Sequence, residues 1–162
     1  MCIRDSPYLA SLNEMFTTTY RSVLKVEEVM LRYLSNNSLT ISEMHMLESI
    51  GKLGGDGTIT DIAQDLEITP PSVTMAVKRL EKKGYITKDR SSVDGRRVRV
   101  RLTEAGRRAE TAHRYFHRQM VRAVAGILEP AEREALLSAL GRINEFMRQK
   151  VEEYDGARRE NA

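Results

Sequence analysis

The chain has 162 residues, of which 41% are hydrophobic and 30% charged, a balance typical of a globular domain with many exposed charges. Its single cysteine, Cys2, excludes an internal disulfide and a cysteine-rich zinc motif. No apolar run approaches the ~18 residues that span a membrane, and MCIRDSPY at the start lacks the apolar core of a signal peptide. We therefore expect one cytoplasmic domain that does not bind membranes, preceded by a disordered tail over residues 1–7.

The net charge of +3 is spread unevenly along the chain. Residues 69–103 include ten basic and three acidic side chains, a net charge of +7, so the remainder of the chain is acidic. A basic centre in an acidic frame predicts a polyanionic partner at that centre. The alternative is a solvated face that is simply rich in charge.

The first half of the chain has the periodicity of helices. Apolar residues recur at steps of three and four over residues 9–34, which predicts a long amphipathic helix. A second helix is expected from about Thr40 to the glycine-rich stretch GKLGGDG, which ends it. A short third helix is expected to begin at Thr60. A fourth is expected over residues 69–84, with two prolines in its first turn, where they are tolerated.

The periodicity then changes to alternation. RVRVRL, residues 97–102, alternates arginine with apolar side chains, which predicts a half-buried strand with a cationic outer face. YITKDR, residues 85–90, supplies the partner strand of a hairpin. Two long amphipathic helices are expected over 103–127 and 130–154, followed by a disordered tail over 155–162.

This order predicts a mainly α fold with a small β-hairpin wing, in which a winged helix-turn-helix occupies about residues 40–105. If the apolar stripe of the fourth helix from Val73 to Leu80 faces the core, the opposite face can enter the DNA major groove. A merely solvated helix is the alternative, and the arginine-rich hairpin disfavours it by offering a contact in the adjacent minor groove. The candidates are Ser72, Thr74 and Met75 for base edges and Lys78 and Arg79 for guanine or phosphate.

The stretch ITPPSVTMAVKRLEKKGYITKDRSSVDGRRVRVRLTEAG resembles the MarR family of winged-helix bacterial regulators. The wing signature of that family is an Asp, an Arg two residues later, and a strand that ends in Leu-Thr-x-x-Gly. The matching residues here are Asp94, Arg96, Leu102, Thr103 and Gly106. The resemblance covers most of the chain, from about residue 8 to residue 154.

The resemblance to the MarR family implies residue roles and an assembly. Asp94 would order the wing and Arg96 would enter the minor groove, and we expect Arg97 beside them to contact DNA. Helices at about 8–35 and 104–154 would form an intertwined homodimer, in agreement with long apolar stripes that a small core could not cover. A two-fold dimer would bind double-stranded DNA at an inverted repeat.

VLKVEEVMLR, SLTISEMHMLESIGK and HRYFHRQMV together resemble a narrower branch, the MarR-type repressors of fatty-acid synthesis genes in Gram-positive bacteria. This resemblance implies a repressor that uses long-chain acyl-acyl-carrier-protein as co-repressor. Gly95, where that branch often has Arg, and TPPSVTMAV in the fourth helix depart from its pattern and leave the operator sequence open. The alternative is a generic MarR regulator that small phenolic or drug-like ligands release from DNA.

Three histidines and one glutamate are expected to converge in this fold. His113 and His117 lie four apart on one helix face, His45 lies beside the stripe of the second helix, and Glu27 occupies a core slot of the first. Three imidazoles and one carboxylate are the ligand types of a tetrahedral zinc site, and a hydrogen-bonded polar cluster is the alternative. The same four positions resemble the metal ligands of zinc-sensing MarR repressors. Zinc is the only cofactor suggested, although nickel or iron would suit the same ligands.

Catalytic motifs are missing from the sequence. There is no Walker loop, no HExxH and no GxSxG, and GKLGGDG has the wrong spacing for a phosphate cradle. We therefore expect a regulator rather than an enzyme.

Overall fold

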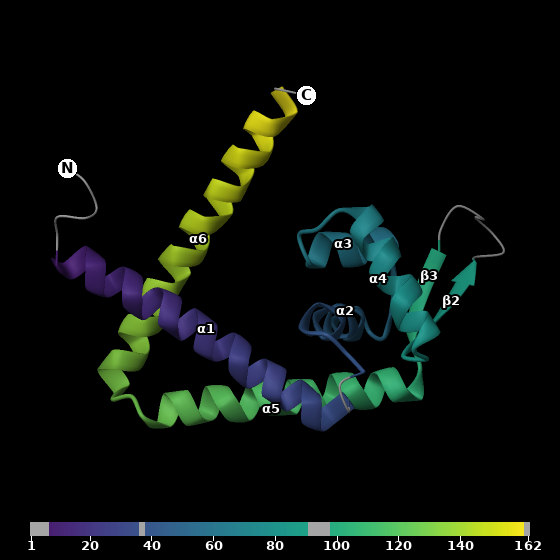
Figure 1. Ribbon diagram of the computed structural model, residues 1–162, viewed down its shortest axis with the longest axis horizontal. Coiled ribbons are helices and arrows are strands. Elements are labelled where there is room, and N and C mark those ends of the chain that lie inside the picture. Colours follow the sequence, from purple (N-terminus) through teal and green to yellow (C-terminus); the bar gives the residue numbers. More distant parts are fainter. Residues whose placement is uncertain (1–6, 36–37, 91–97, 161–162) are drawn as a thin grey trace. The chain divides into compact units, whose positions relative to one another are not determined.

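The computed structural model describes residues 7–35, 38–90 and 98–160 (Figure 1). These residues form six α-helices and one three-stranded antiparallel sheet, which confirms the predicted mainly α fold with a small β wing. None of the described helices combines the length and the apolar character needed to cross a membrane.

The chain divides into two compact units, Met1–Phe116 and His117–Ala162, and the division falls within α5 (Glu104–Gly126). The sequence groups α1 and all of α5 with the dimerisation helices. Within one chain the first unit includes α1 and the start of α5 beside the winged-helix part, and the role of these helices in a dimer stays a prediction. The helices of the first unit are α1 (Pro7–Ser35), α2 (Ile41–Lys52), α3 (Ile59–Asp65), α4 (Pro70–Lys82) and the start of α5.

Reciprocal capping boxes begin α2 and α3. The Thr40 hydroxyl accepts a hydrogen bond from the Glu43 amide at 3.2 Å, and the Glu43 carboxylate accepts one from the Thr40 amide at 2.9 Å. Thr58 and Asp61 form the same arrangement before α3. The sequence places the start of this helix at Thr60, and the structure places it one residue earlier because Thr58 supplies the cap.

The wing is part of a sheet with strand order β1-β3-β2, made of β1 (Asp56–Thr58), β2 (Ile86–Arg90) and β3 (Val98–Leu102). The expected hairpin pairs Ile86 with Leu102 and Arg90 with Val98. The sequence does not predict β1, because three residues are too short for a periodic signal. Gly54 and Gly55, with φ angles of 80° and 82°, precede this strand, and such backbone favours glycine.

The core lies where α2, α3 and α4 pack beside the sheet (Figure 1). The predicted inner stripe of α4 is confirmed, since Val73 and Leu80 are fully buried and Ala76 and Val77 nearly so. Each fully buried aliphatic side chain contributes about 1.5–3 kcal/mol relative to an exposed one. The core therefore fixes which face of α4 is left outside.

The second unit contains the rest of α5 and α6 (Pro130–Glu160). The helix begins at Pro130 as expected, but it continues to Glu160, so the predicted disordered tail over 155–162 is wrong as far as residue 160. The tail residues Ala157, Arg158, Arg159 and Glu160 are good helix formers, which explains the extension. The tail predicted at residues 1–7 lies almost wholly outside the described residues, and Pro7 already belongs to α1.

Candidate nucleic-acid interface and histidine cluster

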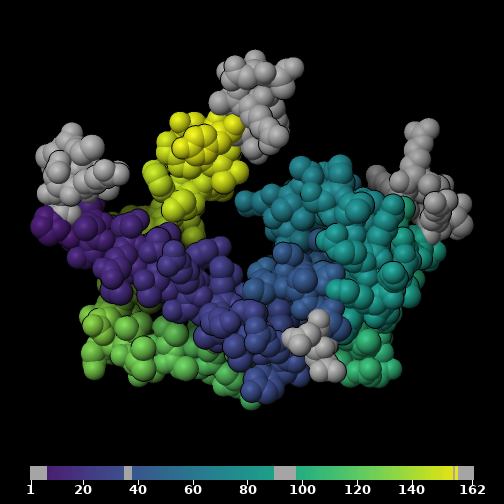
Figure 2. All heavy atoms as spheres, viewed as in Figure 1, coloured from purple at the N-terminus to yellow at the C-terminus, as the bar shows by residue number. Residues whose placement is uncertain are grey.

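The outer face of α4 is available to a ligand. The five side chains of α4 that are expected to contact DNA are all exposed, namely Ser72, Thr74, Met75, Lys78 and Arg79. The segment that forms α4 is coloured teal in Figure 2. Met75 is 55% exposed, so its side chain is open to a partner. The Thr74 hydroxyl donates to the Pro70 carbonyl at 2.9 Å, so its oxygen can still accept a further hydrogen bond.

The cations of α4 differ in their partners. Arg79 Nε lies 3.6 Å from Glu43 Oε1, and Lys83 Nζ donates to Glu43 Oε2 at 2.7 Å. Lys78 and Lys82 form no ion pair with any residue that the structure describes. Of the two predicted cationic contacts, Lys78 is therefore the more available to phosphate, and Arg79 is partly held by the protein.

Glu43 is ionised in the folded protein at neutral pH. Its side chain is only 2% exposed, and burial raises its pKa. The hydrogen bonds from Lys83 and from the backbone of Thr40 outweigh burial and hold the pKa of Glu43 below its ordinary value of 4.5. A buried charge thus joins the first turn of α2 to the end of α4. The sequence signal that predicts it is the Thr-x-x-Glu spacing of a capping box.

The cationic outer face predicted for β3 is partly neutralised. Asp56 on β1 accepts hydrogen bonds from Arg99 Nε at 3.0 Å and from Arg101 Nε at 3.1 Å. The Arg99 hydrogen bond lowers the pKa of Asp56, and Arg101 adds to the effect against desolvation. These arginines of β3 therefore hold β1 to the sheet. The expected wing contacts Asp94, Arg96 and Arg97 lie outside the described residues.

The Leu-Thr-x-x-Gly signature has a structural explanation. The Thr103 amide donates to the Tyr85 carbonyl at 3.0 Å, and its hydroxyl donates to the Gly84 carbonyl at 2.8 Å. The Gly106 amide donates to the Thr103 hydroxyl at 3.1 Å. A Cβ atom at Gly106 would lie 2.1 Å from the Tyr85 oxygen. The motif therefore fastens the start of α5 to the beginning of β2.

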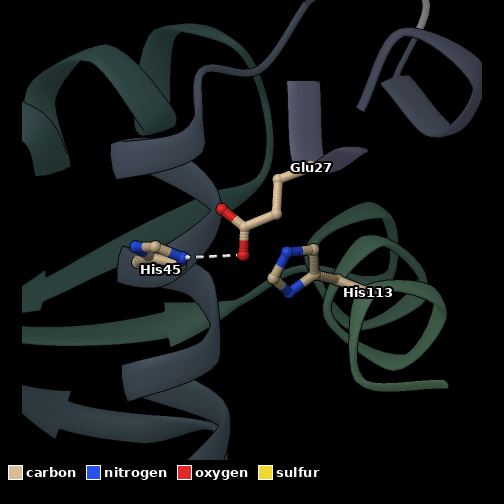
Figure 3. A group of neighbouring side chains, drawn as sticks. All are labelled: Glu27, His45 and His113. Atoms are coloured by element: carbon tan, nitrogen blue, oxygen red, sulfur yellow. Dashed lines mark ion pairs between the residues drawn. The ribbon is translucent and has the colours of Figure 1, made fainter. Parts of the chain in front are cut away.

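Three of the four predicted cluster residues converge (Figure 3). Glu27 on α1, His45 on α2 and His113 on α5 point toward one another, and each offers a ligand atom within 4.8 Å of the others. His45 Nε2 lies 3.8 Å from Glu27 Oε1, and the two imidazole centroids are 6.0 Å apart. Glu27 is 5% exposed and His113 is fully buried, whereas His45 is half-buried. The inward placement expected for Glu27 and His113 is thus observed.

Glu48 also belongs to this cluster, although the sequence does not single it out. His113 Nδ1 lies 3.2 Å from Glu48 Oε1. Glu48 follows His45 by three residues on α2, and this spacing is the signal that predicts a shared face. His117 lies one turn after His113 on α5 but belongs to the second unit, so its part in the cluster stays a prediction.

The donor set fits a metal ion in its chemistry. Imidazole and carboxylate bind zinc at about 2.0–2.2 Å, so two tetrahedral ligand atoms are about 3.4 Å apart. Ligand atoms within 4.8 Å of one another need only a small side-chain adjustment to reach that spacing. His113 Nδ1 also lies 3.2 Å from Glu48 Oε1, and a carboxylate beside the second ring nitrogen is the usual companion of a metal-bound histidine.

Comparison with known proteins places the chain in a family. A model of the MarR family matches residues 39–98. The structure of Streptococcus pneumoniae FabT in complex with DNA is 33% identical, covers 86% of this chain and 97% of that one, and superposes with a TM-score of 0.81. The chain belongs to the MarR family.

The curated relatives are more distant. The chain is 26% identical over 105 residues to the uncharacterised HTH-type transcriptional regulator YhjH of Bacillus subtilis, and that match covers 65% of this chain. It is 29% identical over 82 residues to the HTH-type transcriptional repressor MdtR of Bacillus subtilis, a match over 51% of this chain. The matches span 59% and 52% of these relatives' lengths. The relatives are transcriptional regulators, which confirms the expectation of a regulator rather than an enzyme.

Proposed function

We propose that this MarR-family protein is a cytoplasmic transcriptional repressor that binds double-stranded DNA as a homodimer. The outer face of α4 carries the proposal, because polar, cationic and apolar side chains stand exposed together on one helix with a fixed inner face. The similarity to FabT, whose structure contains DNA, supports the same conclusion.

In this proposal α4 enters the major groove. Ser72 and Thr74 offer hydroxyl groups to base edges, and Met75 suits contact with a thymine methyl group. Lys78 and Arg79 follow toward phosphate or guanine. Asp94, Arg96 and Arg97 act in the wing, with Arg96 in the minor groove, as the resemblance to the family implies.

The homodimer is supported by apolar side chains that are exposed in the described part of the chain. On α6, Leu137, Phe146 and Val151 are 73%, 53% and 53% exposed, and α1 exposes Phe16 to 49%. A second copy that covers these helices would present two α4 helices about 34 Å apart, one turn of DNA, to an inverted repeat.

A gel shift with DNA from upstream of the protein's own gene tests the proposal. We expect a retarded complex that survives competition by unrelated DNA, because specific binding exceeds non-specific binding by about 10³-fold or more. Thr74→Ala and Met75→Ala should change which base pairs are preferred. Equal competition by specific and unrelated DNA would contradict a sequence-specific regulator.

The effector that we propose is long-chain acyl-acyl-carrier-protein, acting as a co-repressor on fatty-acid synthesis genes. The resemblance of three sequence stretches to that branch supports it, as does the similarity to FabT. An apolar groove of about 430 Å³ in the first unit could take an acyl chain. The groove is lined by Lys25, Val26, Val29, Met30, Tyr33, Leu34 and Phe116.

A co-repressor must favour the DNA-competent state, so it should lower the operator Kd. We expect acylated carrier protein to tighten operator binding, and the same carrier protein without an acyl chain to leave the Kd unchanged. If both leave it unchanged, the fatty-acid assignment is wrong. The alternative is then a MarR regulator that a small ligand releases from DNA.

Metal sensing is a second candidate, favoured by the convergence of Glu27, His45 and His113. These residues would hold a zinc ion, with His117 as a proposed fourth ligand, and the ion would join α1, α2 and α5. Calorimetric titration of chelator-treated protein with zinc tests this directly. We expect one site per chain that His113→Ala abolishes, and no saturable zinc binding would leave the cluster as a hydrogen-bonded network.

A further inference from the structure

Glu43 carries more contacts than a helix cap requires. One oxygen of its carboxylate, Oε2, accepts hydrogen bonds from the Thr40 amide at 2.9 Å and from Lys83 Nζ at 2.7 Å. Its other oxygen lies 3.6 Å from Arg79 Nε. Capping of α2 explains only the first of these contacts. The other two reach across to the second half of α4, the helix that we place in the major groove.

Which nitrogen of Arg79 faces Glu43 determines which of its N–H groups can still donate to DNA. An arginine has five N–H donors in a planar fork, one on Nε and four on two terminal nitrogens. Arg79 turns Nε toward the buried carboxylate, while 57% of its side chain is exposed. An arginine whose Nε faces a carboxylate in an ion pair leaves its terminal nitrogens available for a bidentate contact with guanine or phosphate.

We infer that Glu43 is a positioning residue for sequence recognition, which orients Arg79 of α4 so that its terminal nitrogens meet one defined acceptor in the operator. The inference rests on the proposed DNA-binding function. It concerns how specificity arises within α4, and Glu43 itself touches no DNA. Because Glu43 is 2% exposed and accepts a hydrogen bond from the backbone amide of Thr40, which both controls below retain, it is a rigid support for a flexible side chain.

Loss of this support should affect specific and non-specific DNA differently. A specific contact needs Arg79 in one orientation, and immobilising such a side chain only on binding weakens affinity by about threefold to tenfold. Non-specific binding needs only positive charge near phosphates, and Glu43→Gln removes a negative charge nearby. We therefore expect Glu43→Gln to weaken operator binding by about threefold to tenfold while non-specific affinity stays equal or rises.

The experiment measures the Kd for the operator and for a scrambled duplex by fluorescence anisotropy, well below the unfolding temperature of each variant. Thr40→Ala is the matched control, because it removes the other half of the capping box and keeps Glu43 beside Arg79. Lys83→Met removes the ion pair at the end of α4 and also keeps that contact. Both controls should retain the wild-type ratio of the two Kd values.

A double-mutant cycle completes the test. If Glu43 acts through Arg79, Glu43→Gln should change the ratio in the wild-type chain and not in the Arg79→Ala chain. Equal losses in the Thr40→Ala or Lys83→Met control, or additive effects in the cycle, would overturn the inference and leave Glu43 a structural residue. A wild-type protein that does not distinguish operator from scrambled DNA would instead overturn the proposed function.

Discussion

Two single residues, Gly106 and Glu43, lie where elements of the winged helix contact one another. At Gly106 the first turn of α5 approaches the backbone oxygen of Tyr85, and Thr103 bonds both segments. At Glu43 one buried carboxylate joins the start of α2 to the end of α4. Each residue fixes the relative position of two elements of the DNA-binding part.

Gly106→Ala should destabilise the protein. The new Cβ would lie 2.1 Å from the Tyr85 oxygen, so backbone must move, and overpacking of this kind costs about 1–3 kcal/mol. Urea unfolding followed by circular dichroism measures the loss. Gly126→Ala is the control, because apart from its own turn of helix no described atom lies within 4 Å of the new Cβ. Equal stability of the Gly106 variant and wild type would contradict the close approach.

Glu43→Gln should reduce the free energy of unfolding by about 1.5–3 kcal/mol at pH 7, the range for hydrogen bonds to charged groups. The folded-state pKa of Glu43 lies below 4.5, so its charge stabilises the folded state above that pH. The contribution disappears as the pH falls through the folded-state pKa. Urea midpoints should therefore differ at pH 7 and converge in acid, and a difference that grows in acid would refute the ion pair.

At the scale of elements, periodicity predicts most of the fold. The inner stripe of α4 and the β2–β3 hairpin follow from steps of three and four and from alternation, because one buried face selects them. β1 is not predicted because its pairing with β3 depends on residues far away in the sequence. The hydrogen bond from Arg101 to Asp56, for example, is seen only in the structure. The end of α6 is not predicted because the charged residues there are compatible with either a helix or a disordered tail.

The histidine cluster shows the same limit. Spacing within one helix predicts that Glu27 and His113 face inward, as they do. The same spacing places Glu48 on the face of His45, but that Glu48 Oε1 lies 3.2 Å from His113 Nδ1 on another helix is seen only in the structure. His45 points to Glu27 but remains half-buried, because it lies at the edge of the α2 stripe rather than in it.

On the outer face of α4, we expect Lys78 to contribute to affinity for DNA of any sequence and not to the choice of sequence. Lys78 has no ion-pair partner in the described part of the chain, so we expect it to neutralise a phosphate. Lys78→Ala should then weaken binding to all sequences and lower the salt slope of log K by about one per protomer. Titrations at several salt concentrations measure this slope. An unchanged slope would remove Lys78 from the interface.

At the scale of the whole molecule, exposed apolar helix faces require a partner. Leu140 and Met147, two turns apart on α6, are 44% and 45% exposed. Replacing both by Glu should convert a dimer into a monomer, because charges cannot be buried unpaired in an apolar interface. Sedimentation equilibrium measures the mass, and circular dichroism controls for folding. A folded variant that remains dimeric would place the interface elsewhere.

The central claim is that this MarR-family chain recognises a DNA sequence through α4 as a two-fold dimer. In vitro selection from random duplex DNA tests it most directly, without knowledge of the regulated genes. We predict enrichment of one inverted repeat whose half-site centres are about one helical turn apart, and loss of that enrichment in a Thr74→Ala, Met75→Ala double variant that retains its fold. A folded wild-type protein that enriches no sequence, or a double variant that enriches the same repeat equally well, would contradict the claim.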